Sequence, residues 1–495
     1  MTRRVGLGTS PSRPARRRLL LTVLALLATG GGLGWQGGLS ASGRDFPPPV
    51  PAAVCDAGSR PETGVQGRVP SSDYASGRAA KGYTCNARVV AHQGTSGGFK
   101  VLRYVDAAGR ACAYYDASQP IPIRLPGQLT FLTGPGTGVS VLDMTRPTRP
   151  RLATSLTTPT MLSPHESLLV NPRRGLLAAV MGNTFASVGV LEVYSIAEDC
   201  RSPQLLSRTT EPLLGHESGW SHDGRTFYAS SSGGQTLTAI DLDDPTAPQR
   251  IFTVVGVNYH GMRLSPDDRT LYVAHISDDL SGLTLPGKGL RILDVSQIQE
   301  RRPSPTAPVI ADLTWPEGSI PQVAQPFTRG GRSYLLQVDE FSTVGLNDGS
   351  LDVARATVGA ARIIDVTDVR RARVVSRLRL AVHQPAARIE AAGDPGAGDV
   401  FGGYTAHYCS VPTEISPRLA ACSMIGSGLR VFDISDPARP REVAYVNEPT
   451  EAGSAALSQP AWDVRRRQVW FSDQNSGFYV VRLTGRAAAL LRPGL

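Results

Sequence analysis

The chain has 495 residues, of which 41 % are hydrophobic and 19 % charged, and it contains 52 glycines and 38 prolines. This composition is too apolar for a disordered chain and too rich in glycine and proline for a helical bundle. The formal net charge is +9, but six arginines lie in the first 18 residues, ahead of every acidic residue, so the rest of the chain has only +3. A near-neutral chain without a block of like charge argues against nucleic acid as a partner.

The first 43 residues have the pattern of an export signal. A basic stretch at residues 1–18 precedes an apolar run at residues 19–28, and small residues follow at residues 40–43. This order is typical of a secretory signal peptide, and the run is short for a membrane span, which needs about 20 apolar residues. We predict a signal peptide in residues 1–43 or, as the alternative, an N-terminal signal anchor, which would be the only contact with a membrane. Both leaders place the remaining chain outside the cytoplasm, in the cell envelope or extracellular.

All six cysteines follow this leader, and none forms a Cys-x-x-Cys pair. An even number of cysteines in an exported chain predicts disulfides rather than a zinc ribbon or a redox pair, with buried free thiols as the alternative. We expect Cys409 and Cys422 to be bonded, because they lie on neighbouring apolar segments joined by a proline-containing turn. The connectivity stays open for the other four cysteines, Cys55, Cys85, Cys112 and Cys200.

Residues 44–84 are rich in proline, glycine and arginine and are predicted to form a linker or strap; after them, one pattern recurs through residues 85–495. Its clearest copy is GLRVFDISDPARPREVAYV at residues 428–446, in which an apolar segment, an Asp-Pro turn and a second apolar segment follow one another. The turn position recurs, at intervals of 46 to 71 residues, at Asp143, Ser195, Asp241, Asp294, Asp365, Asp433 and Arg482. Two copies have serine or arginine in place of the aspartate, so their turns are expected to differ.

Each copy predicts two strands, because β-branched and aromatic residues favour strands while aspartate and proline support the turn between them. Upstream of most copies lies another hairpin, such as residues 265–272, so each repeat contains four short strands. Four strands in roughly 45–50 residues are typical of a propeller blade. We therefore predict an all-β fold, a seven-bladed β-propeller of four-stranded blades. Closing the ring requires a strand from the other end of the chain, and we expect residues 87–91 to complete the last blade, with residues 487–491 as the alternative.

The repeat at residues 428–446 resembles the LVIVD family of bacterial exported β-propellers, and its copies extend this resemblance over residues 85–483. Further segments that are similar to exported actinobacterial members of that family are residues 58–70, 82–86, 112–116 and 407–412. The resemblance implies the propeller fold and export. It implies no catalytic residues, because the family as a whole has no agreed catalytic set.

Histidines recur at or near the start of the first strand in several predicted blades. The first strand of a propeller blade is innermost, so equivalent positions converge on the central channel. Converging imidazoles could bind a transition metal such as Cu or Zn, as in the similar layout of the methanethiol oxidase or selenium-binding propellers. The alternative is that these side chains only line the channel with hydrogen bonds, and no other cofactor is expected. The candidates are His165, His216, His260 and His407, which are also the candidate metal ligands, and Gln322 and Gln459.

Carboxylates lie next to several of these positions. Glu166 and Glu217 each follow a channel histidine, and Asp339 and Glu340 lie near the end of a predicted strand. Successive side chains of a strand point to opposite faces, which predicts that these carboxylates orient turns rather than meet the histidines. Secondary channel candidates, at the ends of second strands, are His275 and Asp473.

The function is predicted less directly than the fold. A Gly-x-Ser-x-Gly match at residues 94–98 lacks the strand–turn–helix setting of a hydrolase nucleophile. Insertions at residues 341–358 and 388–404 are expected to project as loops, where rigid scaffolds usually bind partners. We therefore predict a monomeric binding or scaffold module of the cell envelope for a protein, peptide or glycan, rather than an enzyme. The alternative is a metal-dependent (Cu or Zn) oxidoreductase with a histidine-lined central channel.

Overall fold

The computed structural model describes residues 46–117, 138–182, 189–231, 235–280, 285–343, 356–397 and 403–491. The leader predicted at residues 1–43 and parts of the two insertion loops lie outside these residues. Within the described chain, no helix combines the length and the apolar character that crossing a membrane requires.

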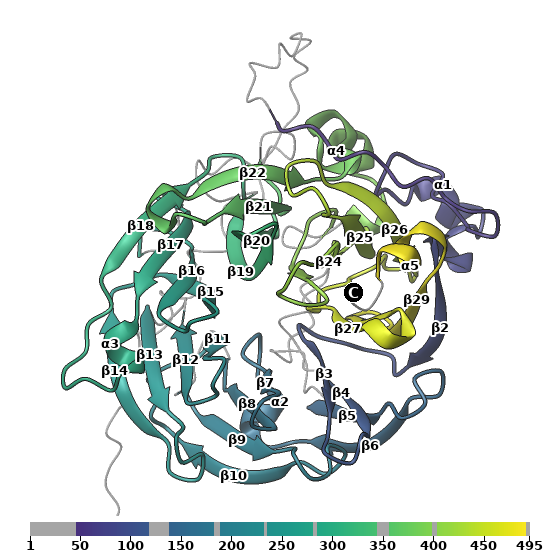
Figure 1. Ribbon diagram of the computed structural model, residues 1–495. Helices are drawn as coiled ribbons and strands as arrows, with labels where there is room; N and C mark the ends of the chain where they lie inside the picture. Colours follow the sequence, from purple (N-terminus) through teal and green to yellow (C-terminus); the bar gives the residue numbers. More distant parts are fainter. Residues whose placement is uncertain are drawn as a thin grey trace, which may run out of the picture. The chain divides into compact units, whose positions relative to one another are not determined.

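Seven antiparallel sheets follow one another around a central axis and form a seven-bladed β-propeller, as predicted (Figure 1). From the axis outward, the first three blades are β3 (Val101–Val105), β4 (Ala111–Asp116), β5 (Val139–Asp143) and β6 (Arg151–Leu156); β7 (Leu169–Asn171), β8 (Leu176–Val180), β9 (Leu191–Ser195) and β10 (Gln204–Thr209); and β11 (Glu217–Trp220), β12 (Thr226–Ser231), β13 (Thr236–Asp241) and β14 (Gln249–Val255). The next two are β15 (Tyr259–Leu264), β16 (Thr270–His275), β17 (Gly289–Asp294) and β18 (Val309–Thr314); and β19 (Ile320–Arg329), β20 (Arg332–Glu340), β21 (Ala361–Asp365) and β22 (Arg373–Leu378).

The last two blades also contain strands from the N-terminal part of the chain. They are β23 (Tyr408–Ser410), β24 (Leu419–Ser423), β25 (Leu429–Asp433), β26 (Arg441–Asn447) and β1 (Tyr83–Cys85); and β27 (Ala461–Asp463), β28 (Gln468–Asp473), β29 (Gly477–Leu483) and β2 (Ala87–Gln93). Helices in the described residues are short: α1 (Ser71–Ala75), α2 (Pro159–Leu162), α3 (Ser296–Gln299), α4 (Pro385–Ala391) and α5 (Gly485–Leu490). Single 3₁₀ turns occur at Ala79–Lys81, Val369–Arg371, Ala381–His383, Pro395–Ala397 and Val464–Arg466.

The aspartate of the repeat supports the turn after the third strand of a blade. The Asp433 side chain accepts a hydrogen bond from the backbone N–H of Ser435, two residues further on. The same bond, at 2.9–3.1 Å, is made by Asp143, Asp241, Asp294 and Asp365. This turn is the physical reason why the sequence repeats Asp at that point.

The middle strands of the blades are apolar on both faces, because each blade packs against two neighbours. All five residues of β8 and of β24 are buried, for example. The sequence of such a strand is a continuous apolar run rather than an alternation of apolar and polar residues. The core therefore consists of apolar layers between successive blades.

The ring closes as predicted from the sequence. β2 is the outermost strand of the seventh blade and pairs antiparallel with β29. Its pairing contains a one-residue register shift, which also occurs between the third and fourth strands, counted from the axis, of every other blade. The alternative segment, residues 487–491, instead contributes to α5, whose residues Ala487 and Leu490 pack against the apolar layer beside β29.

Loss of β2 is expected to open the ring. We compare a chain that begins at Ala87, which keeps β2, with one that begins at Gly94, which lacks it. The shorter chain leaves the edge of β29 unpaired, and an exposed apolar edge pairs with other chains. Size-exclusion chromatography and thermal unfolding should show more aggregation and a lower unfolding midpoint for the shorter chain than for the longer one, because both lack the strap and β1 and only the shorter one also lacks β2. Equal behaviour of the two chains would contradict the role of β2.

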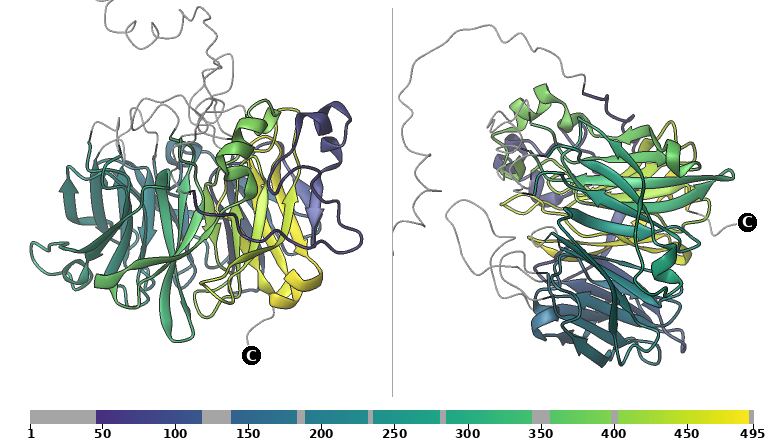
Figure 2. Two further views of the ribbon diagram at one scale, coloured as in Figure 1. Left: turned by 90° about the horizontal axis from the view of Figure 1, so that it is seen from above. Right: turned by 90° about the vertical axis from the view of Figure 1, so that its left-hand side faces the viewer.

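Residues 46–82, called the N-terminal strap below, run along the outer strands of the fifth and sixth blades (Figure 2). The Val50 N–H donates to the Arg379 carbonyl, which follows β22, and the Glu442 N–H of β26 donates to the Pro51 carbonyl. The chain then adds β1 as a fifth strand to the sixth blade, an addition that the repeat pattern did not predict. The strap is therefore attached to the propeller by backbone hydrogen bonds as well as by side chains.

All six cysteines are paired. The expected bond between Cys409 and Cys422 joins directly opposite residues of β23 and β24. The two pairs left open by the sequence are Cys55–Cys85, which ties the strap to β1, and Cys112–Cys200, which joins the first and second blades. Three disulfides and no free thiol accord with an oxidising environment.

Candidate functional site

The side chains at the starts of the innermost strands meet near the axis in two groups. The first, called the axial cluster below, consists of His165, Glu166, His216, His260, Gln322, Glu340 and His407. It includes all four histidines predicted from the sequence and one of the two predicted glutamines. The other predicted glutamine, Gln459, belongs to the second group.

Glu166 lies at the centre of the axial cluster, with its side chain almost fully buried. Its Oε1 is 2.9 Å from His407 Nε2 and accepts a hydrogen bond from Gln322 Nε2 at 2.7 Å. Its Oε2 is 3.3 Å from His216 Nε2 and 3.2 Å from His260 Nε2. The expectation that Glu166 would orient a turn, away from the histidines, is wrong.

The local backbone explains this correction. His165 has a φ of +48°, and both it and Glu166 precede β7 rather than belong to it. Because the alternation of side chains applies only within an extended strand, it does not separate these two neighbours. His216 likewise lies in a bend just before β11, outside the extended strand. Alternation therefore does not determine the side to which its neighbour Glu217 points.

Glu340, the last residue of β20, also reaches the axial cluster. Its Oε2 lies 2.9 Å from His407 Nε2 and its Oε1 lies 3.6 Å from His260 Nε2. Its neighbour Asp339 points elsewhere, to Arg362 at 2.7 Å. Only one of the two carboxylates at the end of this strand therefore belongs to the site.

Backbone carbonyls orient two of the imidazoles. His260 Nδ1 lies 3.1 Å from the carbonyl oxygen of Gln322, and His407 Nδ1 lies 2.6 Å from that of Leu457. A carbonyl oxygen only accepts, so each Nδ1 carries the proton and donates it. This arrangement directs both Nε2 atoms toward the carboxylates, and it is the usual way in which proteins orient histidines that bind metals.

Burial and neighbouring charges shift the pKa values of the axial-cluster side chains in opposite directions. Burial and the neighbouring His216 lower the pKa of His165 well below its usual range. Burial opposes charge at Glu166 too, but attraction to His260 and the close imidazoles of His216 and His407 hold the pKa of Glu166 well below its ordinary value. At His407 the close carboxylates of Glu166 and Glu340 outweigh burial and raise its pKa to about 10. The centre of the cluster is thus an ionised carboxylate in a buried setting.

Several of these close atoms are not hydrogen-bonded. Among the described residues, neither Glu166 Oε2 nor His407 Nε2 has a hydrogen-bond partner, although other polar atoms lie within 3.3 Å of each. His165 Nδ1 and His216 Nδ1 likewise have none. Buried polar atoms are nearly always paired, so atoms that converge without pairing indicate a shared ligand.

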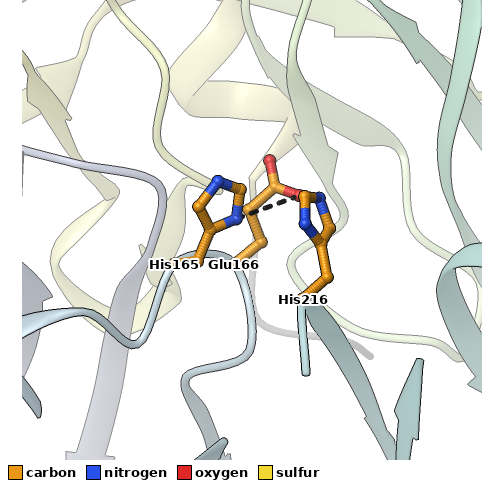
Figure 3. Close-up of side chains that lie close together, drawn as sticks. All are labelled: His165, Glu166 and His216. Carbon is orange, nitrogen blue, oxygen red and sulfur yellow. Dashed lines mark ion pairs between the residues drawn. The ribbon is translucent and has the colours of Figure 1, made fainter. Parts of the chain in front are cut away.

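The spacing of these atoms fits a metal ion. Nε2 of His216 and Nε2 of His260 are 2.8 Å apart, and Glu166 Oε2 lies 3.2–3.3 Å from both. With metal–ligand bonds of about 2.0–2.2 Å in a tetrahedral site, neighbouring ligand atoms are about 3.3–3.6 Å apart, so the two contacts to the carboxylate are close to this spacing and the two Nε2 atoms would move apart around an ion. Two sets of three ligand atoms lie within 4.8 Å of one another: His165, Glu166 and His216, drawn in Figure 3, and Glu166, His260 and Glu340. Imidazole and carboxylate ligands suit zinc, copper, iron or nickel.

The second group, called the lysine cluster below, is centred on Lys100, which the sequence analysis did not single out. Lys100 Nζ donates to Glu217 Oε1 at 3.0 Å, to the Tyr408 hydroxyl at 2.9 Å and to Gln459 Oε1 at 3.4 Å. Arg263 Nη1 lies 3.6 Å from the same Glu217 carboxylate. Burial lowers the pKa of Lys100 to about 8, against the attraction of Glu217.

The position of Lys100 in the repeat could have identified it as a residue near the axis. Lys100 immediately precedes β3, as Gln459 shortly precedes β27, and the two residues form a parallel bridge between neighbouring blades. Lys100 is therefore the first-blade equivalent of the positions chosen in the other blades. Lys100 was not predicted because only histidines and glutamines at these positions were considered as channel residues.

The secondary candidates lie apart from both clusters. His275 Nε2 is 2.9 Å from Asp278 Oδ1. Asp473 accepts hydrogen bonds from the backbone N–H groups of Ala455, at 2.7 Å, and Asn475, at 2.8 Å. These contacts give both residues local structural roles.

Comparisons with known proteins identify no family. No family model and no curated protein matches the sequence. Among solved structures, Kuenenia stuttgartiensis hydrazine synthase is similar at 12 % identity, covering 79 % of this chain and 97 % of that chain, with a TM-score of 0.48. The periplasmic gluconolactonase PpgL of Pseudomonas aeruginosa is similar at 16 % identity, covering 69 % and 87 %, with a TM-score of 0.46. At these identities and TM-scores, neither similarity bears on function.

Proposed function

We propose that this chain is an exported β-propeller that binds a divalent transition metal ion in the axial cluster. The observation that supports the proposal is the convergence of His216 Nε2 and His260 Nε2, which lie 2.8 Å apart within hydrogen-bond distance of each other, on Glu166 Oε2, which has no hydrogen-bond partner among the described residues. Glu340 lies close enough to complete the coordination, and His407 can join it only by releasing its Nε2 proton. The absence of sulfur ligands from the cluster favours Zn²⁺ or Cu²⁺ over Cu⁺.

Two further functions predicted from the sequence stay proposals. A metal-dependent oxidoreductase requires a redox-active metal, so it follows only if the bound metal is copper or iron. Binding of a protein, peptide or glycan rests on the loops at residues 341–358 and 388–404, of which residues 344–355 and 398–402 lie outside the described chain. Membership of the LVIVD family rests on the repeat itself, and export rests on the leader and the disulfides.

The test is the metal content of the chain from residue 44 onward, exported under oxidising conditions and measured by mass spectrometry of the elements. We expect close to one equivalent of zinc or copper, which the double variant His216→Ala, His260→Ala loses. The matched control is His92→Ala, His275→Ala, which removes two histidines outside the axial cluster and should keep the metal.

A second readout follows the ligands directly. Cobalt(II) added to metal-free protein should give visible absorption bands typical of nitrogen and oxygen ligands, and the axial double variant should not show them. Protein that binds neither zinc, copper nor cobalt after dialysis, or a double variant that retains the metal, would leave the histidines as hydrogen-bonded lining of the axis.

A further inference from the structure

One face of the fifth blade carries three arginines in a row. On β21, Arg362 lies directly opposite Arg377 of β22, and Arg379 follows two residues further along the chain. Residues two apart in an extended chain point to the same side, so these three guanidinium groups share one face of the sheet. Like charges directly opposite one another destabilise a sheet unless anions lie between them.

Two of the three arginines have a carboxylate partner. Arg362 Nη2 lies 2.7 Å from Asp339 Oδ2, and Arg377 Nε donates to Glu317 Oε1 at 2.6 Å. Within the described residues, the Arg379 guanidinium forms no ion pair and no hydrogen bond at Nε or Nη2. This part of the blade therefore has one more positive charge than negative charges.

The excess charge is buried. Arg362 is 2 % exposed and Arg379 is 1 % exposed. Four of their nitrogen atoms, Nε and Nη1 of Arg362 and Nε and Nη2 of Arg379, have no hydrogen-bond partner in the described part of the chain. A buried charged group is strongly destabilising when it is left unpaired, so such donors indicate an anion that pairs with them. Burial, and then repulsion from Arg362, lower the pKa of Arg379 to about 10.

The surroundings enclose this site on two sides. The indole of Trp315 lies against the Arg362 guanidinium, 4.0 Å from the ring centroid. The N-terminal strap covers Arg379, with the Phe46 ring centroid 6.0 Å from the guanidinium carbon and the Val50 N–H bonded to the Arg379 carbonyl. The remaining oxygen of Asp339, Oδ1, also has no partner among the described residues, so it can accept a hydrogen bond from an anion that carries a proton.

We propose that Arg362 and Arg379 bind a small oxyanion, such as hydrogen phosphate, between the fifth blade and the N-terminal strap. A guanidinium presents a planar fork of N–H donors that matches two oxygens of such an anion; Nε and Nη2 of Arg379 form one such fork, and the free nitrogens of Arg362 are further donors. The site is separate from the axial cluster and does not depend on the metal. Its occupation offsets the excess positive charge of the arginine row.

The test measures anion binding to the chain from residue 44 onward. Protein denatured after extensive desalting is first analysed by ion chromatography for phosphate and sulfate that remained bound. Inorganic phosphate and sulfate are then titrated into anion-free protein, at constant ionic strength set with sodium chloride. We expect one saturable site for at least one of the two anions, and a preference for phosphate would show that Asp339 accepts its proton.

Arg379→Gln is the decisive variant, because it leaves the Asp339–Arg362 pair intact and is therefore expected to fold. We expect it to weaken anion binding at least tenfold. Arg371→Gln, at an exposed arginine just before β22, is the matched control and should bind as the natural chain does. The axial double variant His216→Ala, His260→Ala should also bind the anion normally, which separates this proposal from the metal site.

Two outcomes would overturn the proposal. One is a protein that retains no anion and shows no saturable binding of phosphate or sulfate beyond chloride. The other is a folded Arg379→Gln variant that binds either anion as tightly as the natural chain.

Discussion

Replacing Arg430 with methionine is expected to destabilise the protein by roughly 3–5 kcal/mol, the usual cost of removing one partner from a buried ion pair. Arg430 is fully buried and pairs with Glu62 of the N-terminal strap and with Glu442 of β26. Its Nε also donates to the Ser427 carbonyl at 2.7 Å. Methionine keeps much of the volume but leaves two carboxylates buried side by side without a cation.

The two carboxylates explain why the effect should be large. Burial raises the pKa of Glu62, and only the attraction and hydrogen bonds of Arg430 act strongly against it. Without the guanidinium, Glu62 can avoid burial only if the strap leaves the sixth blade. We therefore expect the strap to become sensitive to limited proteolysis in the variant under conditions in which it is resistant in the natural chain.

The measurement is denaturant-induced unfolding together with this proteolysis. The matched control is Arg441→Met, on the neighbouring strand β26, whose side chain is 45 % exposed and pairs with Asp433 at 2.9 Å. An exposed pair contributes about 0–1 kcal/mol, so this control should change little. A similar, small loss in both variants would show that Arg430 does not hold the strap.

Replacing Lys100 with methionine is the second change for which we expect a loss of roughly 3–5 kcal/mol. Lys100 and Glu217 are both fully buried, and both Glu217 oxygens accept hydrogen bonds from Lys100 Nζ, at 3.0 and 3.1 Å. The variant leaves Glu217 with the Tyr408 hydroxyl and with Arg263, whose Nη1 is 3.6 Å away.

A double-mutant cycle separates the cost of an unpaired charge from the contribution of the pair itself. Lys100→Met and Glu217→Gln are compared singly and together by denaturant unfolding. Because the amide of the double variant is neutral, the double variant should be more stable than Lys100→Met alone. Losses that simply add would show that the two side chains do not interact across the axis.

The fold was predictable because the repeat is local. β-Branched runs, the Asp turn and its spacing specify strands and hairpins within about 50 residues, and seven such units close only as a ring. The pairing of Cys409 with Cys422 was predictable for the same reason, since they lie on neighbouring strands. Cys112 and Cys200 are 88 residues apart, and only the packing of two blades brings them together.

The candidate site was predictable in part. The starts of innermost strands converge in any propeller, and this placed His165, His216, His260 and His407 near one another. Glu166 was expected elsewhere, because the positive φ of His165 cannot be deduced from strand alternation. Glu340 was also expected to orient a turn, and this is wrong, because it reaches the histidines from the end of a second strand rather than from a first strand.

The sequence by itself determined the repeat, the number of blades and the closing strand, because neighbouring residues specify strands and turns through short-range preferences. Only the tertiary structure decided that Glu166 lies among four imidazoles, that Lys100 meets Glu217 and that Arg379 lacks a partner within the described chain. The first two groups join side chains from different blades, and the third lies where the strap packs on the fifth blade. Their distances depend on how the blades are rotated about the axis and packed, which no local pattern records.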